Sequence, residues 1–147
     1  MSTDSLPEKS PTHLWLVGGL ALLWNAFGAL DFVMTQTRNE TYMGQFSPEQ
    51  LDYFYGFPAW VVATWALATW GGVLGCVLLL LRKRWAVPVF GASLVCMLLT
   101  TVHNYVLTNG LEVAGGVFPI VFSALIFVVA AMLLVYARRM RDQGVLR

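Results

Sequence analysis

The sequence has few charged residues and no marked excess of basic ones. Charged residues make up 12% of the 147 positions, whereas soluble proteins average about 25%. Nine Lys and Arg residues against eight Asp and Glu residues leave a formal net charge of +1. Recognition of nucleic-acid phosphates needs clustered positive charge, so we expect no nucleic-acid partner. The low charge also argues against an ordinary soluble domain.

Cysteine is scarce as well, and the usual metal and catalytic motifs are missing from the sequence. Cys76 and Cys96 stand alone in apolar stretches, which predicts neither a disulfide framework nor a Cys/His metal site. There is no HExxH, no CxxC and no pair of carboxylates within an apolar stretch. We therefore expect no metal, no cofactor and no catalytic residues.

Long apolar stretches are what the sequence has in abundance. Hydrophobic residues make up 58% of the chain, and an α-helix needs about 20 mainly apolar residues to cross a membrane. Unbroken runs such as 77–81 lack the alternation of polar and apolar residues that a membrane β-barrel requires. We predict one all-α membrane domain over residues 1–147, with tails at 1–13 and 138–147. Its four-helix bundle has these predicted spans: 14–34, 58–81, 85–107 and 117–137.

Lys and Arg lie mainly on one side of the predicted bundle. The connection 82–84 is Arg-Lys-Arg, and the last residues, 138–147, contain four arginines. The other two connections, 35–57 and 108–116, contain a single basic residue, Arg38. Because basic loops stay on the cytoplasmic side, we predict that both termini are cytoplasmic and that the two longer connections face outward.

The first outer connection contains the signature of a short helix. Ser47, Pro48 and Gln50 match a cap residue, a first-turn proline and the partner residue of a capping box. Several aromatic residues follow as far as Phe57. A helix within 47–57 is predicted, either lying at the membrane surface or folding inward as a lid over the bundle.

Two ionisable side chains, Asp31 and His103, fall inside the predicted spans. Each lies about one turn from the outer end of its helix, and charged groups in a span are costly enough to be functional candidates. One hypothesis is that they face each other, so that the pair senses or relays protons. The simpler alternative is that each lies at headgroup level and contacts water.

Other polar and aromatic side chains share the outer halves of the helices, whereas the cytoplasmic halves are almost wholly apolar. This pattern favours a pocket open to the outside over a continuous channel. The deep indole of Trp65, like those of Trp24 and Trp70, fits either a stacking wall for a ligand or plain packing. The predicted ligand-binding residues are Asn25, Asp31, Trp60, Thr64, Trp65, Thr100, His103 and Asn104.

Gly71 and Gly75 form a GxxxG pattern in the second span. Small residues at this spacing allow another helix to approach closely. That helix belongs either to the same chain, which we favour, or to a second copy of it.

Three segments carry a resemblance to known proteins: Trp-Asn-Ala-Phe-Gly-Ala-Leu-Asp at 24–31, Phe-Tyr-Gly-Phe-Pro-Ala-Trp at 54–60, and His-Asn-Tyr-Val-Leu at 103–107. Over nearly all of residues 13–140 the chain resembles a family of small, uncharacterised bacterial inner-membrane proteins, some labelled sugar transporters. The resemblance implies a multi-pass protein of the bacterial inner membrane. The layout is also distantly similar to DoxX-like four-helix proteins, in architecture alone.

Two functions are compatible with these features. The first is the binding or transport of a small molecule through an outward-facing polar pocket. The second is a non-catalytic accessory or assembly subunit of a larger membrane complex. The expected partners are membrane lipid, a small-molecule ligand, and a homo-oligomer or larger complex.

Overall fold

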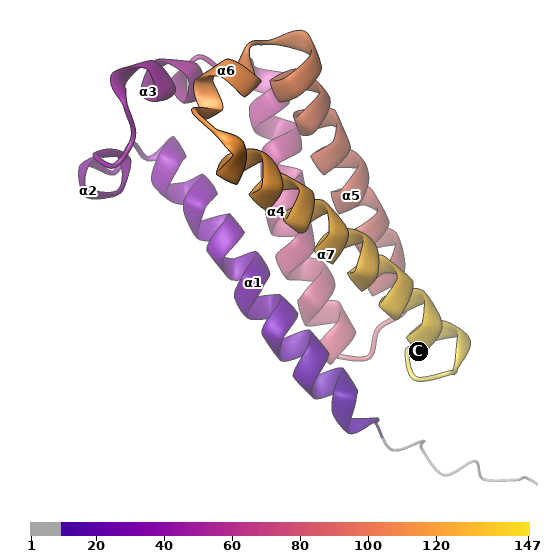
Figure 1. Cartoon of the computed structure of the whole chain (residues 1–147). Helices are drawn as coiled ribbons and strands as arrows, with labels where there is room; N and C mark the ends of the chain where they lie inside the picture. Colours follow the sequence, from indigo (N-terminus) through magenta and orange to yellow (C-terminus); the bar gives the residue numbers. More distant parts are fainter. Residues whose placement is uncertain (1–9) are drawn as a thin grey trace, which may run out of the picture.

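The computed structural model describes residues 10–147, which are helical throughout their length apart from short connections and contain no strand (Figure 1). Four helices are long and apolar enough to cross a membrane, so the predicted all-α fold with four spans is confirmed at this level. Most of the predicted N-terminal tail, 1–9, lies outside the described residues. The long helices are α1 (Thr12–Gln36), α4 (Ala59–Leu80), α5 (Ala86–Val102), which continues as the π-helix η1 (His103–Leu107), and α7 (Val117–Asp142).

The C-terminal segment is more ordered than a free tail. Helix α7 continues beyond the predicted span to Asp142, and the chain then turns at Gly144, whose φ is 77°. Leu146 is buried beside the connection between α4 and α5. The backbone of Arg147 exchanges hydrogen bonds of 3.0 and 2.8 Å with Arg84 and Arg82. The basic residues of the two segments therefore lie at one end of the bundle.

The four long helices do not form a closed ring. Helix α1 packs on α4, α4 on α5, and α5 on α7, with α7 crossing in front of α4 and α5 in Figure 1. Apart from the shared apolar core at one end, α1 and α7 are joined by a ring contact and a hydrogen bond. The rings of Trp24 and Phe122 lie 5.9 Å apart, and His13 Nδ1 lies 2.6 Å from the hydroxyl of Tyr136. A seam between α1 and α7 is left without close helix packing.

Glycines of α4 set its close contacts with two neighbouring helices. A Cβ atom at Gly75 would lie 2.6 Å from the ring of Phe90 on α5, and one at Gly72 would lie 2.1 Å from Oδ1 of Asn25 on α1. At Gly71 the nearest atom, Cβ of Ser93, would be 3.2 Å away. The GxxxG pattern thus serves helices of the same chain, as favoured from the sequence.

The buried core is concentrated at one end of the bundle. That end contains the start of α1, the connection between α4 and α5, and the end of α7 (Figure 1). Away from it the helices pack less tightly, and most apolar side chains face outward, as expected for surfaces that lipid covers. The main core residues are Leu14, Cys76, Leu79, Ala86, Phe90, Ala137, Met140 and Leu146.

Three short helices cover the opposite end: α2 (Glu40–Met43), α3 (Pro48–Tyr55) and α6 (Gly110–Ala114). Helix α3 begins with the predicted capping box, in which Gln50 N donates to Ser47 Oγ at 3.2 Å and Ser47 N donates to Gln50 Oε1 at 3.1 Å. Helix α2 was not predicted. Its cap is Asn39, whose side chain accepts from the backbone N–H of Tyr42 at 3.0 Å.

Helix α3 packs against the segment that follows α5. The Tyr53 hydroxyl lies 2.7 Å from Thr108 Oγ1, and Gln50 Nε2 donates to the Val113 carbonyl at 3.3 Å. These contacts join the two connections at this end of the bundle, so α3 is held in place by the protein itself.

Candidate functional site

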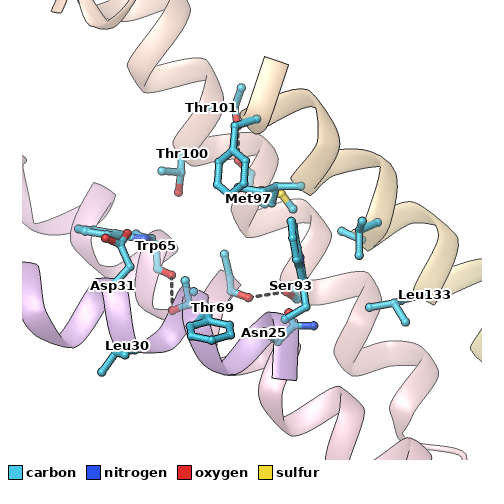
Figure 2. Close-up of a pocket in the computed structure, with 18 of the residues that line it drawn as sticks. Asn25, Leu30, Asp31, Trp65, Thr69, Ser93, Met97, Thr100, Thr101 and Leu133 are labelled. Carbon is cyan, nitrogen blue, oxygen red and sulfur yellow. Dashed lines mark hydrogen bonds between the residues drawn. The ribbon is translucent and has the colours of Figure 1, made fainter. Parts of the chain in front are cut away.

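A cavity of about 610 Å³ lies among the four long helices (Figure 2). Its volume is within the range of about 300–1,000 Å³ that is usual for small-molecule sites. All four spans contribute to its wall, and Tyr42 of α2 is the lining residue from a connecting segment. The residues that line the cavity include Trp24, Asn25, Phe27, Leu30, Asp31, Tyr42, Trp65, Ala68, Thr69, Ser93, Met97, Thr100, Thr101, Phe122, Ala130 and Leu133.

Most of the cavity wall is apolar or aromatic, and the hydroxyl groups in it already have hydrogen-bond partners. Thr69 and Thr101 donate to carbonyls of their own helices at 3.1 and 2.8 Å. Ser93 of α5 donates to the carbonyl of Ala68 on α4 at 2.6 Å. Each hydroxyl has one proton to donate, so these groups offer a ligand acceptor lone pairs rather than free donors.

Asn25 lies at mid-height on α1 and also has its donors engaged. Its Nδ2 donates to the Ala21 carbonyl at 2.8 Å and approaches Cys76 Sγ at 3.5 Å. Its Oδ1 packs over Gly72, where a side chain would not fit. Asn25 thus ties α1 to α4 and leaves an amide oxygen at the cavity.

Asp31 is the carboxylate of the cavity, and Tyr42 is its partner. The Tyr42 hydroxyl donates a hydrogen bond to Asp31 Oδ1, so helix α2 is connected to the C-terminal part of α1. Within residues 10–147 the Asp31 carboxylate has no ion-pair partner. Burial, the hydrogen bond to Asp31 and the negative charge of Asp31 together raise the pKa of Tyr42 to about 12, with burial the largest cause.

The cavity brings together half of the residues predicted from the sequence. Asn25, Asp31, Trp65 and Thr100 line it. The remaining predicted residues lie outside its wall: Trp60, Thr64, His103 and Asn104. Thr64 is nevertheless adjacent, because its hydroxyl lies 2.9 Å from that of Thr100.

The hypothesis that Asp31 and His103 face each other does not hold, because the two side chains make no contact in residues 10–147. His103 is buried, its Nδ1 lies 3.1 Å from Asn104 Oδ1, and its ring meets the edges of Phe57 and Trp60 at centroid distances of 5.6 and 5.4 Å. The imidazole therefore packs against Phe57 and Trp60 at the start of α4, and His103 does not line the cavity. The predicted depth of the two residues in the membrane was similar, but Asp31 contacts Tyr42 whereas His103 contacts Phe57 and Trp60.

Two kinds of site residue were missed in the sequence. Ser93 is polar in an otherwise apolar half-helix, and this isolation was a usable signal. Tyr42 is one of several aromatic residues in a connection, and no local pattern separates it from Tyr53 or Tyr55. Its role comes from the path of the chain between α1 and α2.

The fold and the cavity together define a class of protein: a multi-pass membrane protein with a cavity among its spans. No protein-family model, curated protein or solved structure matches the chain. The function is therefore argued from the chemistry of the cavity.

Proposed function

We propose that this inner-membrane protein binds a small, largely apolar molecule in the cavity among its four spans. The observation that carries the proposal is the cavity itself, which has about 610 Å³ of space and a mainly apolar and aromatic wall. Tightly packed bundles leave few voids larger than a water molecule. A space of this size among helices that are otherwise tied together by glycine contacts is suited to a ligand.

The rim of the cavity supports entry from the lipid phase. Phe27 and Leu30 on α1 and Phe122 on α7 all line the cavity, yet they are 62%, 45% and 43% exposed. They lie along the seam where α1 and α7 make little direct contact. Our proposal therefore differs from the polar, outward-facing pocket expected from the sequence: the proposed site is mainly apolar and opens toward the lipid between α1 and α7.

The distribution of basic residues supports a cytoplasmic location for both termini. The connection between α4 and α5 and the end of α7 share one end of the bundle, and both contain Lys or Arg. By the positive-inside rule this end faces the cytoplasm. The cavity then lies in the outer part of the membrane, below α2 and α3, and the resemblance to bacterial inner-membrane proteins agrees with this placement.

The proposal is tested by native mass spectrometry of the protein purified in mild detergent. We expect a bound small molecule in the wild type, and we expect it to be lost in Ala130→Trp, whose larger side chain fills part of the cavity. Ala124→Trp is the matched control, because Ala124 lies on the same helix but is exposed and does not line the cavity. Equal occupancy in both variants, or co-purification of a protein subunit without any small molecule, contradicts the proposal.

A further inference from the structure

Asp31 gives the cavity a net negative charge. No Lys, Arg or His lines the cavity, and among the described residues Asp31 has the Tyr42 hydroxyl as a partner but no cation. Charges within a membrane span are normally paired or face water. A ligand that carries a positive charge would supply the missing partner.

The aromatic wall favours the same kind of ligand. Trp24, Trp65 and Phe122 come from three different spans and line one cavity. The faces of indole and phenyl rings attract cations, and more strongly where water is excluded. In Figure 2 Trp65 and Asp31 lie together on one side of the cavity, so an aromatic wall and the carboxylate are available to one positive group.

Hydrogen-bonding capacity points in the same direction. The protons of Thr69, Ser93 and Thr101 and the amide protons of Asn25 are already donated within the protein. Apart from the indole N–H groups of Trp24 and Trp65, the cavity therefore offers mainly acceptors. A carboxylate needs several donors from the protein, and sugar hydroxyls use both donors and acceptors, whereas a quaternary or protonated amine needs no donor.

We infer that the ligand is a lipophilic cation, with its positive group against the Asp31 carboxylate and its apolar part between α1 and α7. This inference rests on the proposed function and adds the chemical class of the ligand. Tyr42 closes the outer end of the site through its hydrogen bond to the same carboxylate. The phenol and the cation share Asp31, because Tyr42 occupies one carboxylate oxygen.

The test compares a naphthylmethyl trimethylammonium ion with its neutral isostere, in which carbon replaces the nitrogen. Binding to the full chain is measured by equilibrium dialysis in nanodiscs of zwitterionic lipid, with empty nanodiscs as the blank. We expect the wild type to bind the cation about tenfold or more tightly than the isostere, as for a charge-assisted contact that excludes water. Asp31→Asn should remove this preference and leave binding of the isostere unchanged.

One variant serves as a control. Asp52→Asn removes an exposed carboxylate outside the cavity and should keep the preference for the cation. Unchanged binding of the isostere by Asp31→Asn shows that the cavity is intact.

The outcomes separate the two proposals. If the wild type binds both probes equally, or if Asp31→Asn keeps the preference, the inference about the cation is overturned and small-molecule binding stands. If the wild type binds neither probe and the native protein carries no small molecule, the proposed function fails as well.

Discussion

At the scale of residues, the contact between Asp31 and Tyr42 joins a membrane span to a connecting helix. Asp31 lies five residues before the end of α1 at Gln36, which is about 7.5 Å along a helix. Tyr42 follows the turn at Arg38, whose φ is 52°. The phenol reaches back over the end of α1, so this hydrogen bond ties α2 to α1 in addition to the backbone hydrogen bonds of the turn.

We expect Asp31→Asn to lower the pKa of Tyr42. Burial, the largest cause, and the hydrogen bond and negative charge of Asp31 together raise this pKa from 10.0 to about 12. Removal of the negative charge leaves the effect of burial, so the pKa should fall without reaching 10.0. Tyrosinate absorbance is measured with and without Tyr42→Phe to isolate this residue. An unchanged pKa would show that the two side chains are not in contact, and Asp52→Asn is the control.

The same shift predicts a loss of stability at alkaline pH. Because the folded-state pKa of Tyr42 lies above the unfolded-state value of 10.0, its contribution to stability is fully present below pH 10 and is lost as the pH rises toward about 12. The difference in unfolding midpoint between the wild type and Tyr42→Phe should therefore shrink over this range. A difference that stays constant between these pH values contradicts the assignment.

At the scale of elements, glycines determine how closely α4 meets its neighbours. Gly75→Ala should destabilise the bundle by about 1–3 kcal/mol, the usual cost of overpacking. The added Cβ would lie 2.6 Å from the ring of Phe90, which is buried and has little room to move. Gly91→Ala is the control, because nothing lies within 4 Å of its added Cβ. Thermal unfolding in detergent should show a loss for Gly75→Ala and none for Gly91→Ala.

The connecting helix α3 is held on the π-helix by Tyr53. Its hydroxyl lies 2.7 Å from Thr108 Oγ1 and 3.3 Å from Asn104 Oδ1. Tyr53→Phe should weaken this attachment by about 1 kcal/mol, the usual value of one hydrogen bond. Tyr55→Phe is the matched control, since Tyr55 contacts Arg38 through its ring.

Hydrogen–deuterium exchange of α3 is the measurement for this pair of variants. Faster exchange is expected for Tyr53→Phe and not for Tyr55→Phe. Equal exchange would mean that the aromatic contacts of Tyr53 with Phe54 and Phe57, rather than its hydroxyl, hold α3 in place.

At the scale of the whole molecule, the arrangement of helices predicts which loops a reagent reaches. Glu49→Cys should react with a membrane-impermeant maleimide in spheroplasts, and Lys83→Cys should react only after the membrane is opened. The wild type is the blank, because Cys76 and Cys96 lie within α4 and α5. The opposite pattern would reverse the proposed orientation.

Some of the structure could be read from the sequence with little ambiguity. The four long helices follow from the length of the apolar stretches, because a backbone in lipid must satisfy its own hydrogen bonds. The start of α3 follows from Ser47 and Gln50, whose capping box is a local interaction. The close contacts of α4 could be predicted from Gly71 and Gly75. Which helices these glycines contact could not be predicted from the sequence.

The site could be predicted only in part, because an apolar sequence gives little information about which face of a helix points into the protein. Lipid tails are about as apolar as the side chains of a neighbouring helix. The spans are apolar on nearly every side, so a buried face and a lipid face look alike. Depth placed Asp31 and His103 at the same level, but depth carries no information about direction.

What the sequence alone determined is therefore the number, length and type of the spans, along with the local caps. Tertiary structure decided that Asp31 and His103 contact different residues, that Tyr42 becomes the partner of Asp31, and that α1 and α7 make little direct contact. These results depend on contacts between distant segments, for which side-chain shape matters more than hydrophobicity. The cavity exists because the glycines bring α4 close to α1 and α5 while no equivalent contact joins α1 to α7.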